Sequence, residues 1–436
     1  MRWRARIGAA IAAFALVGTA MTGVASANDG RHTRERTRPA QLSKLQHIVV
    51  LMQENRSFDS YFGQLEDQGQ PGTAEEPNTG NPNPTNPSGP PIVPFHQTDL
   101  CISSDVDHGW TGTHNEINGG LMNDFTAQNV SPEDPTGSRS MGYYDQSDLP
   151  YYYALARTFG IGDRYFASVP GPTYPNRFYL AAATSFGHIE NDLPPAGGWP
   201  QPTIFGRLQA AGVTWKVYSS QFPTVSFFAD VQAHKENLLP ISQYYADAKA
   251  GNLPQVAFVE PTYIGSVSQE SDEHPPANIQ VGQNFTAGVI NALMASPDWT
   301  SSAFLLTYDE HGGFYDHVAP PKAPKPDNIA PMLKPGDVNV PFDQYGVRVP
   351  LLVVSPFSKP HFVSHVVSDH TSILKLIELR FGLKPLTERD EHAHGLTEYF
   401  DFNHPRFDKP PTLPAATIDP AKAARCAAEH PGTLGI

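Results

Sequence analysis

Short, fully apolar runs alternate with helical patterns along the chain. His47–Met52 is a continuous apolar run with β-branched residues, which is typical of a strand covered on both faces of a mostly parallel sheet. Similar runs recur at 213–218, 256–259, 303–307 and 349–355. Apolar residues at the 3.6-residue period predict helices over 285–294 and 373–381. The alternation predicts an α/β fold, with a mostly parallel central sheet and helices on both of its faces.

The first 27 residues are predicted to be a signal peptide. Three arginines and no acid precede an apolar run of small residues at 7–24, and Ala25–Ala27 forms a small-residue cleavage site. A permanent transmembrane anchor is the alternative, but the run is rich in Ala, Gly and Thr and ends at that site. We therefore expect a secreted, extracellular protein.

After the signal peptide, residues 28–43 are predicted to be a flexible polar leader, and residues 44–436 are predicted to be one domain. Residues 69–91 hold seven prolines and are expected to be a solvated insertion loop with long connections on either side. The hydrophobic share of 39% is enough for a packed core, which excludes a wholly disordered protein. We predict a single folded domain with long surface loops.

The net charge of the protein disfavours two classes of binding partner. The formal net charge is −14, and loss of the signal peptide with its three arginines takes it to −17. A protein with this net charge is not expected to bind nucleic acid, and it is not expected to be attracted electrostatically to an anionic membrane. Cys101 and Cys426 are the only two cysteines. Outside the cytoplasm they can pair, although two unpaired thiols remain the alternative.

Polar clusters follow two of the predicted strands. The first strand ends in Glu54 and Asn55, and the strand at 303–307 runs into Asp309 and Glu310. Ligands of open α/β sheets bind beyond the carboxyl ends of strands, so these side chains are expected at one edge. Their oxygen atoms suit a divalent cation, whereas no Cys-based zinc site is indicated. The alternative is that they are strand-end charges facing water.

Thr173 stands just before a helix predicted from Pro175 onward. Proline fits the first turn of a helix, and Phe178 and Leu180 continue the apolar pattern. Free N–H groups at a helix N-terminus favour a bound phosphate, and a nearby cation can activate a threonine hydroxyl. Capping of the helix is the common alternative role for such a threonine.

Three histidines lie in Gly- or Pro-rich turns beside acids: His108, His114 and His274. A histidine can protonate a leaving oxygen or hold phosphate oxygens, and each of these is also a common structural residue. The roles of three further histidines near the same segments are left open: His311, His317 and His370.

Four segments carry a family resemblance. They are, in chain order, 47–63 (HIVVLMQENRSFDSYFG), 170–180 (PGPTYPNRFYL), 272–276 (DEHPP) and 307–318 (TYDEHGGFYDHV). Together they resemble the motifs of the bacterial phospholipase C and acid phosphatase family of phosphoesterases, which belongs to the alkaline-phosphatase-like superfamily. The likeness extends from about Leu45 to Phe381, and its first and last motifs are long and specific.

The resemblance implies a secreted, metal-dependent phosphoric ester hydrolase with an alkaline-phosphatase-like fold. Thr173 would attack phosphorus and form a phospho-threonine, which water then hydrolyses. A divalent cation of unknown identity would be bound by four residues: Glu54, Asn55, Asp309 and Glu310. The phosphoryl group would be steadied, or the leaving alcohol protonated, by His274 together with His108 or His114.

Two positions favour the phospholipase C branch. Acid phosphatase members resemble this pattern with Ser at the nucleophile and a second Asp at the metal, whereas Thr173 and Glu310 stand here. We therefore expect cleavage on the glycerol side of a phospholipid head group, with a broad acid phosphatase as the closest alternative. A non-catalytic secreted binding protein is the alternative from another class. Expected partners are phospholipids or other phosphate esters and a transient contact with a membrane surface; the oligomeric state is not predicted.

Overall fold

The computed structural model describes residues 39–73, 79–103 and 105–433. The predicted signal peptide and residues 28–38 of the predicted leader lie outside this part of the chain. Gln41–Ile436 forms one compact unit. Leu42 belongs to the predicted leader, but its apolar side chain is buried in the main hydrophobic core. Core packing therefore begins before residue 44.

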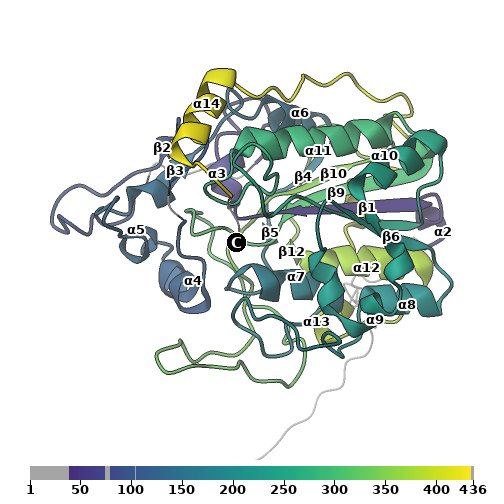
Figure 1. Cartoon of the computed structure of the whole chain (residues 1–436), viewed down its shortest axis with the longest axis horizontal. Coiled ribbons are helices and arrows are strands. Elements are labelled where there is room, and N and C mark those ends of the chain that lie inside the picture. Colours follow the sequence, from purple (N-terminus) through teal and green to yellow (C-terminus); the bar gives the residue numbers. More distant parts are fainter. Residues whose placement is uncertain (1–38, 74–78, 104, 434–436) are drawn as a thin grey trace, which may run out of the picture. The chain divides into compact units, whose positions relative to one another are not determined.

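An eight-stranded sheet is the centre of this unit (Figure 1). Its strand order is β11-β4-β10-β9-β1-β8-β6-β7. The strands span, in that order, Phe362–Ser364, Gly160–Gly162, Leu351–Val354, Ser302–Tyr308, His47–Gln53, Val256–Glu260, Trp215–Ser219 and Leu238–Pro240. Only β10 pairs antiparallel, with β9 and β4, and the other pairings are parallel. The predicted mostly parallel α/β sheet is confirmed.

Two short strand pairs accompany the main sheet. β5 (Tyr165–Phe166) pairs with β12 (Ser368–Asp369), and β2 (Phe95–His96) pairs with β3 (Gly142–Tyr143). The β5–β12 pair joins the segment before the predicted nucleophile to the start of a late helix, so segments 200 residues apart are held side by side.

Helices cover both faces of the sheet (Figure 1). One layer contains α6 (Pro150–Thr158), α10 (Ile241–Ala250) and α11 (Ile279–Met294). The opposite layer contains α7 (Thr173–Ala182), α8 (Ile204–Ala210) and α12 (His370–Phe381). In the described part of the chain, no helix combines the length and the apolar character needed to cross a membrane.

Shorter helices lie in the connections. The α-helices are α2 (Pro39–Leu42), α3 (Phe58–Phe62), α4 (Trp110–Ile117), α5 (Phe125–Gln128), α9 (Ala229–Gln232), α13 (Glu388–Glu391) and α14 (Pro420–Glu429). The 3-10 turns are Asn118–Gly120, Ser138–Met141, Thr224–Phe227, Lys235–Asn237, Pro297–Ser301 and Thr397–Tyr399.

The predicted elements are present, with shifted ends. α11 begins at Ile279 rather than near 285, because the Asn278 side chain accepts a hydrogen bond from the Gln280 N–H and caps the helix earlier. β10 begins at Leu351 rather than at Val349, whose N–H instead donates to Tyr165 O of the small β5–β12 pair. Local capping and pairing, which the apolar pattern does not encode, therefore set the boundaries.

The Pro-rich segment 69–91 is anchored by polar contacts. Its described residues form no helix and no strand beyond an isolated bridge between Asn81 and Ile92. Asn81 is buried, and its side-chain oxygen accepts a hydrogen bond from the Phe125 N–H at 2.8 Å. Gln70 Nε2 donates to His361 O at 2.9 Å, and the Thr126 hydroxyl donates to Pro82 O at 2.6 Å, so the segment is a surface loop fixed to the molecule at several points.

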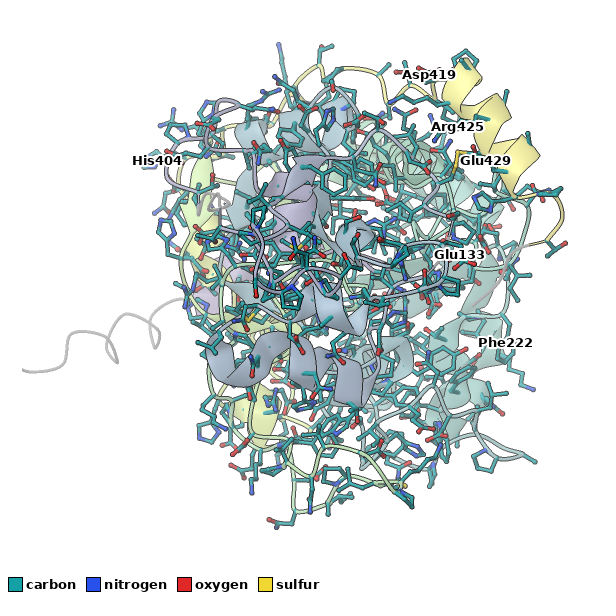
Figure 2. The ribbon with its side chains drawn as sticks, turned by 90° about the vertical axis from the view of Figure 1, so that its left-hand side faces the viewer. Glu133, Phe222, His404, Asp419, Arg425 and Glu429 are labelled. Atoms are coloured by element: carbon teal, nitrogen blue, oxygen red, sulfur yellow. A yellow bond between two sulfur atoms is a disulfide. The ribbon has the colours of Figure 1, made fainter. Side chains whose placement is uncertain are left out.

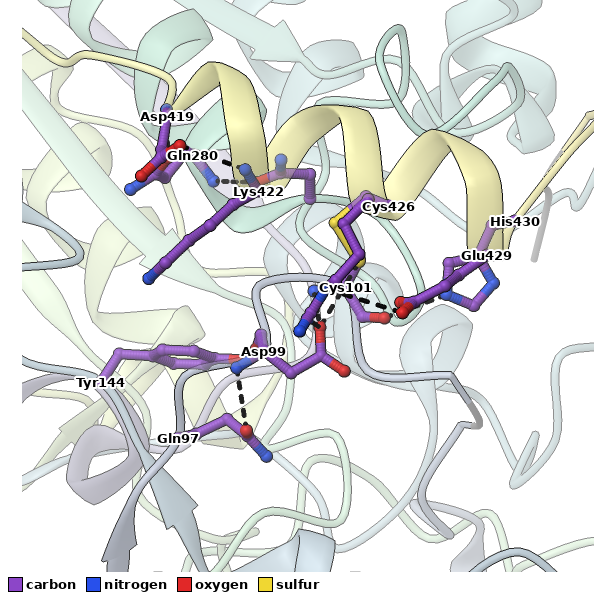
Figure 3. The surroundings of a disulfide bond; sticks show 12 residues. Gln97, Asp99, Cys101, Tyr144, Gln280, Asp419, Lys422, Cys426, Glu429 and His430 are labelled. Carbon is purple, nitrogen blue, oxygen red and sulfur yellow. Dashed lines mark hydrogen bonds and ion pairs between the residues drawn. A yellow bond between two sulfur atoms is a disulfide. The ribbon is translucent and has the colours of Figure 1, made fainter.

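A disulfide holds the C-terminal helix α14 against the rest of the domain (Figure 3). Cys101 and Cys426 are bonded with a Cα–Cα distance of 5.8 Å and a sequence separation of 325 residues, which confirms the pairing. The Arg425 side chain pairs with Asp99 next to the bridge, and the Asp419 N–H donates to Gln280 on α11 at 2.8 Å. Figure 2 shows Asp419, Arg425 and Glu429 along this helix. In the loop-entropy model a bridge of this span stabilises the fold by on the order of 3–5 kcal/mol.

Candidate functional site

The carboxyl ends of β1 and β9 place the predicted metal ligands together. The two strands pair in parallel, with Gln53 opposite Tyr308, so the next residues of each strand leave the sheet at the same edge. The Asn55 N–H donates to Asp309 Oδ1 at 3.2 Å, which joins the two strand ends directly. We call Glu54, Asn55, Asp309 and Glu310 the open acid cluster; each of them is buried.

Arg177 of α7 neutralises part of the open acid cluster. Its guanidinium lies 3.1 Å from Glu54 Oε1 and 3.0 Å from Asp309 Oδ2, and all three side chains are buried. The same guanidinium donates to Tyr263 Oη at 2.7 Å. A buried ion pair of this kind ties the helix that begins at Thr173 to the ends of β1 and β9.

Several oxygens of the open acid cluster have no hydrogen-bond partner although they are buried. They are Glu54 Oε2, Asn55 Oδ1 and Glu310 Oε1. Asp309 differs, because Oδ1 accepts from the Asn55 and Glu310 N–H groups and Oδ2 accepts from Arg177. Buried oxygens without a partner also occur elsewhere in the described residues, for example at Glu378 and Tyr399, and here they leave acceptors available to a further group.

Burial and mutual repulsion dominate the electrostatics of these acids. Burial raises the pKa of Glu54 well above its usual range, Arg177 opposes the rise, and the charges of Asp309 and Asp272 add to it. Burial likewise raises the pKa of Asp309 to about 7 and that of Asp272 to about 8. Glu310 is different: burial raises its pKa, but the nearby charge of His108 and contact with His311 outweigh burial and lower it.

Backbone geometry lets the two loops approach each other closely. Asn55 has φ 59°, in the left-handed region, where Asn is among the more tolerant residues. Gly312 has φ 65°, and a Cβ atom built on it would lie 2.5 Å from Asn55 O. Glycine at 312 is therefore required for the loop after β9 to pass over the loop after β1.

Thr173 is the first residue of α7 rather than the residue before it. The cap position is held by Pro172, and Thr173 makes no capping hydrogen bond. Its hydroxyl is buried and without a partner, and the Tyr174 N–H is capped instead by Asn191 Oδ1 at 2.8 Å. Capping, the common alternative role, does not account for this threonine.

Thr173 shares a helix face with Arg177, because residues four apart on a helix lie one above the other. Since Arg177 contacts Glu54 and Asp309, the Thr173 side chain is directed to the same region. Asn176 fixes the preceding turn: its side chain bonds the Val169 backbone and donates to Gly171 O at 2.9 Å. The turn that presents Thr173 is therefore held from within its own motif.

His108 and His274 lie next to each other, with ring centroids 5.8 Å apart. Each contacts a backbone carbonyl through Nδ1, that of Val106 at 2.7 Å and that of Pro275 at 2.6 Å. A carbonyl only accepts, so Nδ1 carries the proton in both rings and Nε2 is left for another partner. Asp105 Oδ2 lies 3.7 Å from His274 Nε2.

The third predicted catalytic histidine is placed differently. His114 lies within α4, where its Nδ1 contacts Trp110 O at 2.6 Å and its ring packs on the Trp110 ring at 4.3 Å. Of the two partners considered for His274, the structure brings His108 to it and packs His114 against its own helix.

His311 and His370 position members of the open acid cluster. His311 lies between two acids, with Nε2 at 2.8 Å from Glu116 and Nδ1 at 3.3 Å from Glu310. His370, at the start of α12, contacts Asp309 O through Nε2 at 2.7 Å and is fully buried. Burial lowers the pKa of His370 to about 3, so this ring is neutral and orients the backbone.

A second acidic group, built from the same two motifs, is fully bonded. Arg348 donates to Asp316 at 3.1 Å and to Asp59 at 2.5 Å, and the His317 Nδ1 lies 2.6 Å from Asp59. The Asp59 N–H also donates to Asp316 Oδ2 at 3.1 Å. We call Asp59, Asp316, His317 and Arg348 the closed acid cluster; none of their side-chain atoms is among the buried unpartnered ones of the described residues.

The sequence analysis missed two members of the site. Arg177 lies within the PGPTYPNRFYL motif, and Asp272 opens the DEHPP motif. The Asp272 carbonyl accepts from the Glu54 N–H at 2.8 Å, and its buried Oδ2 has no partner. Their positions inside otherwise recognised motifs were the available signal, but nothing in the sequence says that a basic residue pairs with predicted metal ligands.

The residues of the open acid cluster fit a divalent cation by their chemistry. They offer only oxygen donors, and four buried oxygens without partners belong to Glu54, Asn55, Glu310 and Thr173. The three carboxylates do not close around one point, however. Among the described residues, sets of three His, Cys, Asp or Glu ligand atoms within 4.8 Å of one another lie elsewhere. Two examples are Asp105, His108 and His274, and Asp59, Asp316 and His317 of the closed acid cluster. Arg177 bridges the carboxylates of Glu54 and Asp309, at the position where a bound cation would bring these two carboxylates together.

Comparison with known proteins gives consistent results. Residues 45–384 match the Phosphoesterase family. Non-specific phospholipase C1 of Arabidopsis thaliana is 36% identical over 404 residues, covering 85% of this chain and 74% of that protein. Phospholipase C B of Mycobacterium tuberculosis is 33% identical over 443 residues, covering 86% of this chain and 83% of that protein. A solved structure of an alkaline phosphatase superfamily protein from Vibrio parahaemolyticus is 10% identical with a TM-score of 0.37, covering 79% of this chain and 69% of that one.

Proposed function

This chain belongs to the phosphoesterase family, and we propose that it is a secreted, metal-dependent phospholipase C with Thr173 as its nucleophile. It is a hydrolase of phosphoester bonds and has phospholipase C relatives. The single observation that carries the proposal is the buried Thr173 hydroxyl without a partner, on the helix whose Arg177 contacts Glu54 and Asp309. A buried hydroxyl without a partner is costly to a fold unless a ligand uses it.

Thr173 forms the new bond to phosphorus. As its Oγ1 attacks, the threonine hydroxyl releases its proton to water and the bond between phosphorus and the glycerol oxygen breaks. That oxygen takes up a proton from the histidine pair and leaves as the alcohol. The head-group phosphate stays on the threonine until water attacks phosphorus and restores the hydroxyl. The N-terminus of α7 favours the negative charge that develops on the phosphoryl oxygens.

The histidine pair supplies the proton and holds the phosphoryl group. His108 and His274 both keep Nδ1 on a backbone carbonyl, so each presents Nε2 in a fixed direction. Burial lowers the pKa of His274 despite the nearby charge of Asp105. At His108 burial also lowers the pKa, but the charges of Glu310 and Asp105 outweigh it and raise the pKa to about 9, so His108 is the protonated ring of the pair. An imidazole held in this way is suited to protonate a leaving oxygen.

A divalent cation would be held by Glu54, Asn55, Asp309 and Glu310. When bound, such an ion lowers the pKa of an alcohol and offsets phosphoryl charge. His311 and His370 keep Glu310 and the Asp309 backbone in place, and Arg177 fixes α7 against the same strand ends. These contacts hold the strand ends and α7 in place, whereas the three carboxylates would still have to move together around the ion.

A broad acid phosphatase on the same residues is the second candidate. Its support is the family-level match alone, whereas Thr173 and Glu310 at the two diagnostic positions favour the phospholipase C branch. A transient contact with a membrane surface and export from the cell are part of the first proposal, since its substrate is a lipid and the chain opens with a signal-like segment.

Products distinguish the two candidates. Purified mature protein is incubated with dioleoyl phosphatidylcholine and, separately, with a simple phosphomonoester, with and without prior treatment by a chelator. We expect diacylglycerol and phosphocholine from the lipid, turnover of the lipid at least about tenfold above the monoester, and loss of activity on chelation. Faster turnover of the monoester would favour the acid phosphatase, and activity that survives complete metal removal would contradict the cation proposal.

A further inference from the structure

The carboxylate of Glu273, the second residue of the DEHPP motif, accepts hydrogen bonds from several distant segments of the chain. The residue is fully buried. Its Oε1 accepts from Gln53 Nε2 at 3.2 Å and from the Tyr152 hydroxyl, and its Oε2 accepts from the Tyr308 hydroxyl at 2.9 Å. The Tyr61 hydroxyl is a further hydrogen-bond partner. Neither oxygen is among the buried unpartnered atoms of the described residues.

Two unfavourable features of the backbone accompany the placement of this side chain. Glu273 has φ 77°, in the left-handed region that residues with a Cβ atom rarely adopt. Gly282 lies inside α11, where glycine weakens a helix, and a Cβ atom built on it would lie 2.1 Å from Glu273 Cγ. Glycine would adopt the backbone conformation of residue 273 without strain. The presence of Glu there therefore indicates that its side chain is needed.

Two partners of Glu273 stand directly before predicted metal ligands. Gln53 is the last residue of β1 and precedes Glu54, and Tyr308 is the last residue of β9 and precedes Asp309. Glu273 belongs to a third motif, which follows β8 along the chain. One carboxylate therefore bonds both strand ends of the open acid cluster to the DEHPP turn.

The neighbours of Glu273 in the chain supply two groups to the site. The Asp272 carbonyl accepts from the Glu54 N–H at 2.8 Å, and the His274 ring lies against His108 with centroids 5.8 Å apart. Because the Glu273 side chain is held by partners on β1, β9 and α6, the residues on either side of it have little freedom to move relative to the strand ends.

We propose that Glu273 is a positioning residue that fixes His274 and both strand ends of the open acid cluster for phosphoryl transfer. The inference rests on the proposed function and adds a residue that acts through its neighbours. A carboxylate suits this position because it only accepts hydrogen bonds, whereas the tyrosine hydroxyls and the Gln53 amide can all donate them. A misplacement of reacting groups by about 1 Å can lower a rate by about a hundredfold.

The test replaces the carboxylate by an apolar side chain of similar length. In Glu273→Met we expect kcat with dihexanoyl phosphatidylcholine to fall by about a hundredfold, while KM changes by less than about threefold. The loss with p-nitrophenyl phosphocholine should be only about tenfold, because nitrophenolate leaves without a proton from the histidine pair. Glu273→Gln keeps one acceptor oxygen and gains an amide that can donate to the Tyr308 hydroxyl, so it should stay within about tenfold of the wild type.

A control and a measurement without turnover complete the test. Glu378→Met removes another buried carboxyl group, about two helical turns beyond His370 on α12, and should leave both activities within about twofold. The titration of the His274 ring is followed by NMR and assigned by its absence in His274→Gln. Burial lowers the pKa of His274 in the wild type. In Glu273→Met it should move up toward 6.5, because a loosened turn lets water reach the ring.

The outcomes separate positioning from a purely structural role. Circular dichroism and thermal unfolding first establish that each variant is folded. A folded Glu273→Met protein with both activities within about threefold of the wild type overturns the inference. If both activities fall by the same factor, the His274 titration decides: a shift supports positioning, and an unchanged titration refutes it.

Two further cases are decided in the same way. If Glu273→Met does not fold, the Tyr152→Phe/Tyr308→Phe double variant, which removes two donors from the carboxylate, takes its place. A greater loss with the lipid than with the nitrophenyl ester supports the inference, and an equal loss refutes it. If the wild type hydrolyses neither substrate, the proposed function fails, and the His274 titration alone decides whether Glu273 places that ring.

Discussion

The open and closed acid clusters come from the same two motifs but are built in opposite ways. In the closed acid cluster, Arg348 bonds both Asp59 and Asp316, and every buried polar atom has a partner. In the open acid cluster, Arg177 also contacts two carboxylates, yet side-chain oxygens of Glu54, Asn55 and Glu310 have no hydrogen-bond partner. The two clusters therefore differ in how completely their buried polar atoms are hydrogen-bonded, although the ligand atoms of Asp59, Asp316 and His317 lie closer together than those of the open acid cluster.

Buried polar atoms stabilise a fold only when all of them are satisfied. A satisfied cluster such as that around Arg348 is expected to matter for folding and not for chemistry. A cluster with unpartnered oxygens has a cost in the ligand-free protein, and such local costs concentrate at functional sites. Motif membership alone does not distinguish the two, and counting partners does.

The largest expected effect is that of removing the Thr173 hydroxyl next to the open acid cluster. Thr173→Ala should lower kcat/KM by at least about a thousandfold, because loss of an activated nucleophile costs several powers of ten. The free energy of unfolding should change by less than about 1 kcal/mol, since the hydroxyl has no partner to lose. Steady-state kinetics and denaturant unfolding measure both. Thr173→Ser, the control, should keep activity within about tenfold; more than a tenth of wild-type activity in Thr173→Ala would refute the nucleophile.

The next effect tests the closed side. Arg348→Met leaves Asp59 and Asp316 buried and unpaired, and should lower the free energy of unfolding by about 3–5 kcal/mol. Its matched counterpart is Arg177→Met, in which Glu54 and Asp309 lose their guanidinium. Added divalent cation should restore stability in Arg177→Met and not in Arg348→Met. Equal rescue of both variants would remove the distinction between the clusters.

Ligand binding should sharpen the comparison further. A divalent cation at a hundred times its dissociation constant stabilises the folded state by about 2.7 kcal/mol if it binds only that state. We expect this increment, measured as a rise in unfolding temperature on titration, to be lost in Asp309→Asn. Asp316→Asn lowers the starting stability but should retain the increment, and an increment that disappears in Asp316→Asn instead would place the cation in the closed acid cluster.

The smallest effect is the pH dependence of the closed acid cluster. Burial lowers the pKa of His317, but its hydrogen bond to Asp59 and the charges of Asp59 and Asp316 outweigh burial and Arg348, and the pKa is raised above 6.5. A raised pKa means that this contribution is complete below about pH 6.5 and is lost as pH rises through the folded-state pKa. His317→Gln should therefore cost about 1 kcal/mol at pH 5.5 and less at pH 8.5, on the scale of one hydrogen bond. Thermal unfolding at the two pH values tests this, and an equal cost at both would contradict it.

Much of the fold followed from local patterns. The run from His47 became the central strand β1, and the Phe285 pattern lies within α11, because a continuous apolar run or a 3.6-residue period has few other ways to be buried. The ends were less predictable. Asn278 extends α11 toward the N-terminus through a side-chain cap, which competes with other local hydrogen bonds and is settled only in three dimensions.

The candidate site was predictable in its residue types but not in its contacts. Glu54 and Asp309 were expected at one edge because parallel strands align their carboxyl ends, and the hydrogen bond between Asn55 and Asp309 shows that edge. Arg177 was not expected there. A helix face is fixed by how the helix packs on the sheet, and the sequence does not state which strand end Arg177, the fifth residue of α7, will meet.

By itself, the sequence determined the α/β class, the two cysteines available to pair, and the oxygen-rich chemistry of Glu54, Asn55, Asp309 and Glu310, because apolar period and side-chain type are local properties. Only the tertiary structure decided that Asp59 and Asp316 are bonded to Arg348 while Glu54 is left with a free oxygen. Whether a buried polar atom is satisfied depends on every residue that packs around it, and those residues are hundreds of positions apart along the chain.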